Sequence, residues 1–379
     1  MKYTSTLLSL PLLAQAASSV YTGFAYGAFW SDYANTKYKD DFLDGFALAR
    51  NLTTSIPFDS ARIFTCITPN TANDPTEAFD AAVESKTNLL LGFYIMPNSR
   101  DGTPDKQIAN EMLALEKGFQ KHGQKLSDLV IGLSVGNEDI YHWEDVKDAQ
   151  SNPSPGNSAA VISTNIDRVR KLISSSSFSK YMQGKPIGHV DTATHAAKVK
   201  GADFIGVTAY PWWAHKNIED AKASFMSSLE DVKKGAGNTP VWIAEMGWPF
   251  QSDLKGFPEA SAQTMQRYWT EVACSVLGQY TTFWFQLLKD SEVGQPDWVG
   301  PSTTVPAPSG VVEYTTITSY STVTVTNGGS YPNSTTTVHK TWCVTQADVF
   351  RDGRFMTVAG GPPVVDGKCS SPPPYNGHP

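Results

Sequence analysis

The sequence predicts an α/β protein whose main domain, residues 17–300, is a single (β/α)8 TIM barrel. Eight short runs of apolar, β-branched and aromatic residues recur between residues 21 and 288, and such runs are typical of strands that are buried on both faces. Segments with helical periodicity lie between these runs, which is the alternation of a barrel. After residue 300 the composition becomes rich in Ser and Thr, so the barrel is expected to end there.

The first 16 residues predict a secretory signal peptide. Lys2 precedes an apolar run at 7–14, and the small residues Ala14 and Ala16 resemble a cleavage site. The cut could fall as late as residue 19. The apolar run is too short to span a bilayer, and the last residues lack the hydrophobic tail of a lipid-anchor signal. We therefore expect a secreted protein, extracellular or held in a cell wall, with no membrane partner.

The eight expected strands share a high content of β-branched and aromatic residues. They are residues 21–29, 60–66, 88–96, 129–136, 186–190, 203–211, 240–249 and 281–288.

Helical periodicity is clearest at 105–123 and 217–235. The second segment repeats apolar residues at the three- and four-residue spacing of one helix face and ends in Lys-Lys-Gly, a helix C-terminal signal. An open doubly wound sheet is a poorer interpretation, because Gly23 and Gly27 do not complete a Gly-x-Gly-x-x-Gly turn after the first run.

Residues 301–340 are predicted to form a disordered, O-glycosylated stalk. Of these 40 residues, 17 are Ser or Thr, and prolines cluster at the start; such a tract buries too little apolar surface to fold alone. The alternation at 321–326 leaves a strand open as the competing interpretation. A tail with two cysteines, residues 341–379, follows.

The four cysteines allow three pairings, and disulfides are expected in an oxidising compartment. The composition break favours Cys66–Cys274 within the barrel and Cys343–Cys369 within the tail. Asn51 and Asn333 each begin an Asn-x-Ser/Thr sequence and are expected to carry glycans.

The charge pattern excludes some classes of partner. The net charge is −7 and the acidic residues form no blocks, so we expect neither a nucleic acid nor an anionic membrane as a partner. The seven histidines show no metal-ligand spacing. We expect no metal, no cofactor and a monomer.

Polar residues near the ends of the apolar runs are the candidate site, because catalytic groups of such barrels lie at the C-terminal ends of the strands. They are Tyr26, Arg62, Asn137, Glu138, Asp191, Tyr210 and Glu245.

Two glutamates stand out among these candidates. Glu245 lies inside an otherwise apolar run, where a charge is costly unless it is paired or faces a cavity. Glu138 follows the run 129–136, although a simple strand-to-helix turn capped by Asn137 would also explain that position. Two carboxyl groups at one barrel mouth suit glycoside hydrolysis, in which one protonates the leaving oxygen and the other attacks or directs water.

Tryptophans at the same strand ends could stack on sugar faces, although ordinary packing is the alternative. They are Trp212, Trp213, Trp248 and Trp284. A neutral polysaccharide is the expected partner.

Residues 21–290 resemble glycoside hydrolase family 17, the β-1,3-glucanases and β-1,3-glucanosyltransferases, especially of the fungal cell-wall type. The resemblance rests on short motifs: GFAYG, ARIFTC, SVGNED, HVDT, VTAYPWW and AEMGWP. It implies a (β/α)8 fold, retention of configuration, Glu138 as acid/base and Glu245 as nucleophile, with Asn137 and Tyr210 beside them. The segment 283–292 departs from the pattern, with Gln286 and Lys289 where acidic residues are expected.

Three functions remain open at this stage. The first is a secreted retaining β-1,3-glucan hydrolase, with endo action favoured over exo action, or a β-1,3-glucanosyltransferase. The second is a non-catalytic glucan-binding wall protein, which the presence of both glutamates disfavours. The third is another retaining glycosidase on the same barrel, which the Gly-Trp-Pro after Glu245 disfavours.

Overall fold

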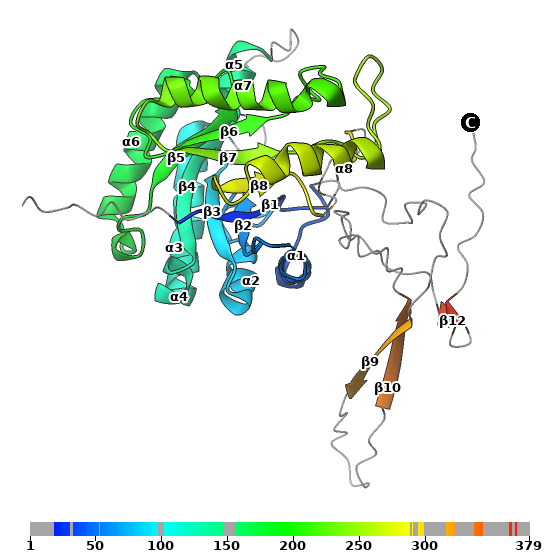
Figure 1. Ribbon diagram of the computed structural model, residues 1–379. Helices are drawn as coiled ribbons and strands as arrows, with labels where there is room; N and C mark the ends of the chain where they lie inside the picture. Colours follow the sequence, from blue (N-terminus) through cyan, green and yellow to red (C-terminus); the bar gives the residue numbers. More distant parts are fainter. Residues whose placement is uncertain are drawn as a thin grey trace, which may run out of the picture.

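The structure, a computed structural model, describes residues 19–30, 33–52, 54–97, 102–146, 156–288, 290 and 295–298, and the backbone of four short segments beyond residue 315. Eight parallel strands form a closed barrel in sequential order, β1 to β8. The predicted (β/α)8 fold is confirmed. Figure 1 shows the strands at the centre of the domain with the helices around them.

The barrel strands are short, as expected for a sheet covered on one face by helices and filled on the other. They are β1 Thr22–Tyr26, β2 Ser60–Ile63, β3 Asn88–Phe93, β4 Val130–Asn137, β5 Ile187–Thr192, β6 Ile205–Ala209, β7 Val241–Met246 and β8 Thr282–Trp284.

The helices follow the strands in the order expected. They are α1 Lys39–Arg50, α2 Ala78–Ser85, α3 Pro104–His122, α4 Gln124–Ser127, α5 Asp139–Glu144, α6 Ala159–Ser175, α7 Ile218–Ala236 and α8 Ala262–Glu271, with short 3-10 turns η1 Ser179–Tyr181, η2 Ala196–Lys198 and η3 Ala273–Ser275. None of the described helices is both long and apolar enough to cross a membrane.

Local sequence signals set the bounds of the longer helices. Thr103 caps α3 by accepting a hydrogen bond from the Lys106 backbone N–H, with Pro104 at the first helical position. Ser158 caps α6 in the same way. Gly123 and Gly237 follow α3 and α7 with positive φ, which an L side chain rarely adopts. These two helices match the predicted segments to within a residue.

Side chains alternate between two cores along the strands. Leu89 and Leu91 of β3 belong to the large core shared with the helices, whereas Leu90 between them joins a small cluster with Ile131, Phe204 and Phe283. Successive strand residues point to opposite faces, so this small cluster fills the barrel interior. It lies near the starts of the strands, which leaves the C-terminal ends for polar groups.

Two antiparallel pairs are described after the barrel. β9 Thr316–Thr322 pairs with β10 Thr337–Cys343, and β11 Val364–Val365 pairs with β12 Lys368–Cys369. β9 and the first four residues of β10 fall in the segment predicted as a stalk, where a strand was the competing interpretation, and β10 continues into the predicted tail. The β-branched threonines of this first pair favour extended pairing. The predicted signal peptide, residues 1–16, lies outside the described residues.

Candidate active site

A cleft of about 1340 Å³ lies at the C-terminal ends of the barrel strands. Glu138 and Glu245 both line it, as do Tyr210 and Trp213. The remaining walls come from loops after the other strands. The structure therefore brings together, in one cavity, the two glutamates that the sequence singles out.

Glu245 lies in β7 and is almost fully buried. One of its carboxylate oxygens is paired with the Arg62 guanidinium, and the other accepts a hydrogen bond of 2.6 Å from the Tyr210 hydroxyl. Both partners bind the charged form of the carboxylate. Burial and the charge of Glu245 raise the pKa of Tyr210 well above its usual value, so the phenol keeps its proton and remains a donor.

Arg62 of β2 connects the two halves of the site. It is 2% exposed, and its second terminal nitrogen donates to the Asn137 side-chain oxygen at 2.6 Å. A planar guanidinium can hold two acceptors at fixed angles. Arg62 and Asn137 thus lie behind the carboxylates rather than on the cleft surface.

Glu138 stands at the turn from β4 to α5, with a left-handed backbone (φ 55°, ψ 26°). This conformation is unfavourable for a residue other than Gly, and such residues cluster at functional sites. Its backbone N–H donates to Val190 O at 2.9 Å. Gly136, two residues before Glu138, has a φ of 85°. A Cβ at this position would lie 2.2 Å from an Asp139 oxygen, so the turn requires glycine here.

Thr208 of β6 links the two glutamates. Its hydroxyl donates to Glu138 Oε1 at 2.6 Å, and its backbone is in register with Glu245 on the neighbouring strand. The Thr208 side chain therefore contacts Glu138, while its backbone lies beside that of Glu245. Burial and the nearby charge of Glu245 raise the pKa of Glu138 to about 8, so this carboxyl is protonated at neutral pH.

The raised pKa of Glu138 predicts how stability changes with pH. Below pH 4.5 the carboxyl is protonated in both folded and unfolded chains. Above it the unfolded chain loses the proton while the folded chain keeps it, so the ionisable group costs stability until the pH reaches about 8. Glu138→Gln removes this cost. At pH 7 the free energy of unfolding of the variant should therefore exceed that of wild type by about 3 kcal/mol at most, since each pH unit contributes about 1.4 kcal/mol.

Chemical denaturation of wild type and Glu138→Gln between pH 4 and pH 9 measures the difference. We expect the two curves to coincide near pH 4 and to separate as the pH rises. A constant difference across this range would contradict the assigned environment of Glu138.

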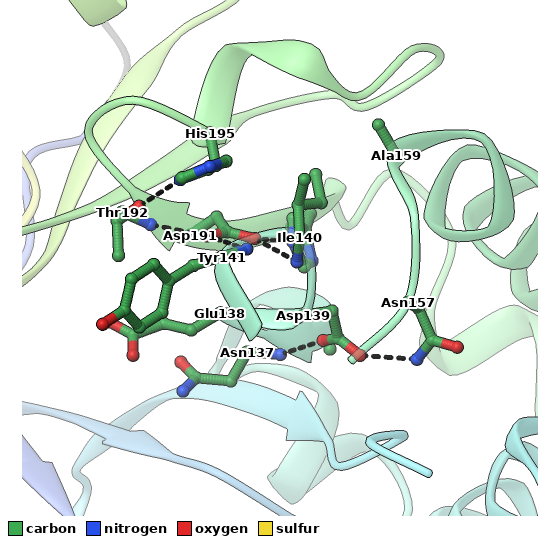
Figure 2. Close-up of polar contacts among 12 residues, drawn as sticks. Asn137, Glu138, Asp139, Ile140, Tyr141, Asn157, Ala159, Asp191, Thr192 and His195 are labelled. Carbon is green, nitrogen blue, oxygen red and sulfur yellow. Dashed lines mark hydrogen bonds and ion pairs between the residues drawn. The ribbon is translucent and has the colours of Figure 1, made fainter. Parts of the chain in front are cut away.

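Two more of the predicted substrate contacts, Asp191 and Tyr26, also lie away from the cleft surface. Asp191 is fully buried, and its oxygens accept the backbone N–H groups of Ile140, Tyr141 and Thr192 (Figure 2). Tyr26 is 1% exposed and donates to Gly45 O. Both are structural in this arrangement, because their polar atoms are already satisfied by backbone groups.

Of the four tryptophans predicted to stack on sugars, one lines the cleft and three are buried. Trp213 is 38% exposed and lines the cleft. Trp212, Trp248 and Trp284 are at most 1% exposed, so packing is the correct interpretation for these three. The indole N–H groups of Trp212 and Trp248 donate to Pro258 O and Glu259 O, as buried tryptophans require.

Several cleft residues were not predicted from the sequence. The aromatic ones are Phe29, Tyr33, Phe64, Tyr94, Tyr141, Phe225, Phe257, Phe285 and Trp298. Tyr94 and Phe285 directly follow β3 and β8 but lie inside the longer predicted strands 88–96 and 281–288, so a more accurate prediction of where these strands end could have found them.

An acidic residue does occur on the β8 side of the cleft. Asp290 lines the cavity, pairs with the buried Lys37 ammonium and accepts the Gly27 backbone N–H at 2.7 Å. Gln286 also lines the cleft, whereas Lys289 lies outside the described residues.

The predicted Cys66–Cys274 disulfide is wrong for this structure, in which both residues are free thiols. Cys66 follows the C-terminal end of β2 and its thiol contacts Gly92 O, whereas Cys274 is exposed in η3, before the start of β8. The two therefore lie toward opposite ends of the barrel. The side chains of Cys343 and Cys369, and Asn333, lie outside the described residues. Asn51 is exposed at the end of α1, where a glycan could be attached.

Metal-ligating side chains do not gather in the described part of the chain: it has no group of three or more His, Cys, Asp or Glu suited to an ion. The groups that line the cleft include carboxyl groups and hydroxyls, which suit proton transfer and attack at a sugar carbon.

Comparison with known proteins gives the family. The sequence model of the BtgE/BtgC glycoside hydrolase domain matches residues 23–298. The "Probable glucan endo-1,3-beta-glucosidase eglC" of Aspergillus terreus is 36% identical over 290 residues, covering 74% of this chain and 57% of that protein. The protein of the same name from Emericella nidulans is 35% identical over 299 residues, covering 76% and 61%. The chain thus spans about three fifths of the length of these relatives.

A solved structure shares the fold. The glycoside hydrolase family 17 β-1,3-glucanosyltransferase of Rhizomucor miehei superposes with a TM-score of 0.55 at 22% identity, over 70% of this chain and 86% of that one. This likeness shows the fold, and the match over residues 23–298, which is nearly the whole barrel, shows that the chain belongs to the BtgE/BtgC glycoside hydrolase family.

Proposed function

We propose that the protein is a secreted retaining glycoside hydrolase that cleaves β-1,3-glucan of the cell wall, with Glu138 as acid/base and Glu245 as nucleophile. The observation that carries this proposal is the contrast between the two carboxyl groups. Glu138, whose pKa is raised to about 8, keeps its proton, whereas Glu245 receives a guanidinium and a phenol hydroxyl. Two neighbouring carboxyl groups in opposite environments are typical of an acid paired with a nucleophile.

The proposed reaction has two steps. Glu138 protonates the glycosidic oxygen while Glu245 attacks the anomeric carbon, so the leaving chain departs and a glycosyl ester forms on Glu245. Glu138, now ionised, takes a proton from water as that water attacks the same carbon and frees Glu245. Two inversions give net retention, for which the carboxyl groups need a separation of about 5–5.5 Å. Thr208, which touches one glutamate and is in register with the other, suits such a short separation.

The cleft supports a neutral polysaccharide as the substrate. Its aromatic walls offer faces for sugar rings, and its polar groups include Tyr141, Thr194 and Gln295. Lining residues come from loops all around the barrel, so the cleft has room for sugars on both sides of the glutamates, which supports endo action. The names of the Aspergillus terreus and Emericella nidulans relatives support β-1,3-glucan as the polymer.

The remaining properties belong to the same proposal. The expected signal peptide supports secretion to the wall or medium, the Asn51 and Asn333 sequons support glycosylation, and Cys343–Cys369 remains the expected disulfide of the tail. We propose a monomer that needs no cofactor for the chemistry above.

Transfer to a sugar hydroxyl in place of water is the second candidate. Trp213, exposed at the cleft wall, could hold an acceptor sugar against the intermediate. A purely glucan-binding wall protein would not need one glutamate held protonated beside another that is paired with a guanidinium.

A time course on a reduced β-1,3-glucan oligosaccharide tests the proposal, with the products sized by mass spectrometry. We expect shorter oligosaccharides at micromolar substrate, and longer ones as well at millimolar substrate, where acceptor competes with water. Equal concentrations of β-1,4- and β-1,6-linked oligosaccharides are the controls. An enzyme that cleaves neither the oligosaccharide nor laminarin, while remaining folded, would refute the proposed activity.

A further inference from the structure

Beneath the site lies a buried histidine, each of whose two ring nitrogens faces a hydrogen-bond acceptor. His189 of β5 is fully buried; its Nδ1 lies 2.7 Å from Val135 O, and its Nε2 lies 3.0 Å from Asp191 Oδ2. A carbonyl oxygen only accepts, so Nδ1 carries a proton. Asp191 Oδ2 also accepts the Ile140 N–H, and hydrogen bonds from His189 and from backbone N–H groups lower the pKa of this carboxyl, so it is ionised and Nε2 donates a second proton to it. His189 is therefore an imidazolium cation.

Each member of the His189–Asp191 pair stabilises the ionised form of the other. Burial alone would lower the pKa of His189, but the hydrogen bond to Asp191 and the charges of Asp191 and Asp139 raise it. Burial would likewise raise the pKa of Asp191, but His189 and the backbone N–H groups lower it. Removing either partner would leave an unpaired buried charge, which proteins avoid.

The pair also holds the turn that carries Glu138. Asp191 accepts the N–H groups of Ile140 and Tyr141, the second and third residues after Glu138. On the other side, Asp139 accepts the Asn137 N–H at 2.8 Å and the Asn157 amide at 2.7 Å. Figure 2 shows these bonds on either side of Glu138. The left-handed backbone of Glu138 is thus fixed from both directions.

We infer that the His189–Asp191 ion pair is the positioning unit of Glu138: it anchors the β4–α5 turn from which the acid extends into the cleft. This inference rests on the proposed function, because it assigns a role relative to the proposed acid/base. Neither residue lines the cleft in the described structure, so both act through Glu138 and not on the sugar. Asp191 is therefore a positioning residue and not the substrate contact expected from the sequence.

The charged groups around Glu138 define the expected pH effect. Besides burial, Glu245 and Asp191 raise its pKa, while the Thr208 hydrogen bond and Arg62 lower it. On α5, burial lowers the pKa of His142 and raises that of Tyr141, so neither changes charge near pH 8 in a way that mimics Glu138. Removing the Asp191 charge should move the titration of Glu138 to lower pH.

Asp191→Asn is the first test, because it removes one charge with little change in shape. We expect kcat to fall about 10- to 100-fold, as for a misplaced catalytic group, with KM within about threefold. The alkaline limb of the pH profile of kcat/KM should move below that of wild type. His189→Gln should cause a similar loss, and the double variant should lose no more than either single variant, because the two act as one unit. If His189→Gln fails to fold, Asp191→Asn decides alone.

His122→Gln is the matched control. His122, at the end of α3, is also paired with a carboxylate, Asp80, at 2.8 Å, but it does not line the cleft. We expect its kcat and pH profile to match those of wild type. A wild-type alkaline limb in Asp191→Asn, or additive losses in the double variant, would overturn the inference.

A direct measurement separates this inference from the proposed function. In protein carrying carbon-13 in its glutamate carboxyls, the Glu138 signal, identified by its loss in Glu138→Gln, reports its pKa without substrate. If wild type cleaves no glucan but this pKa falls in Asp191→Asn, only the proposed function fails. If wild type cleaves glucan and this pKa does not change, only the inference fails.

Discussion

Glu245→Gln is expected to abolish turnover on every substrate, with kcat/KM reduced by at least about 10⁴-fold, as when a catalytic nucleophile is removed. The amide is isosteric with the carboxylate but cannot form the glycosyl ester, and no other described carboxyl group takes both Arg62 and Tyr210 as partners. The loss should be the same for a glucan oligosaccharide and for an activated nitrophenyl glucoside chain. Initial rates on both substrates measure it.

A matched surface variant controls for the loss of charge. Glu219→Gln breaks an exposed ion pair with Arg267 and should change neither the rate nor, measurably, the stability, because solvent screens such a pair. Glu245→Gln leaves the buried Arg62 without its counter-ion, so a loss of roughly 3 kcal/mol is expected, and rates should be taken where both variants are folded. Residual turnover above about 1% of wild type, free of wild-type contamination, would rule out Glu245 as the nucleophile.

The barrel and its two glutamates could be predicted because both follow from features repeated along the chain. Eight apolar runs predict eight strands, and strands of one parallel barrel bring their C-terminal ends to the same rim. Glu245 was conspicuous because it interrupts an apolar run, and the structure shows its neighbours Ile243, Ala244 and Met246 fully buried. The same rule correctly placed Tyr210 in the cleft.

The direction of each side chain could not be predicted by that rule. Asp191 lies at a strand end, but its neighbours in space are backbone N–H groups of α5, which the sequence gives no means of counting. Trp212 and Trp213 are adjacent in sequence, yet only the second reaches the cleft. Thr208 escaped notice because a threonine in a strand is ordinary, and only the fold shows that it touches Glu138.

The cysteine pairing failed for a related reason. A change in composition locates a domain boundary but contains no distance. Disulfides require Cα atoms within about 7 Å of each other, and Cys66 after β2 and Cys274 before β8 belong to opposite ends of their strands.

The second large effect is expected for Glu138→Gln, and it differs from that of Glu245→Gln in kind. A proton from Glu138 is needed only when the leaving group is a poor one, so cleavage of a glucan oligosaccharide should fall by about 10²- to 10⁴-fold. A nitrophenyl glucoside chain leaves without that proton, so its first step should survive and release a burst of nitrophenol. The second step should then stall, because no base remains to activate water.

Added azide distinguishes this role from simple damage to the site. Azide attacks the glycosyl ester as an anion and needs no base, so turnover of the nitrophenyl substrate should recover with rising azide concentration. The product should be a β-glycosyl azide, since a second inversion at the anomeric carbon restores the original configuration.

Glu144→Gln is the matched control: Glu144 lies on the same short helix but pairs with Lys198 outside the cleft, and azide should not affect its rate. An α-glycosyl azide would indicate inversion, and losses on both substrates that azide does not rescue would remove Glu138 from the acid/base role. Rescue with retention, by contrast, requires an ester on Glu245 that is open to attack from the side on which residue 138 lies, which fits a Thr208 that contacts Glu138 and is in register with Glu245.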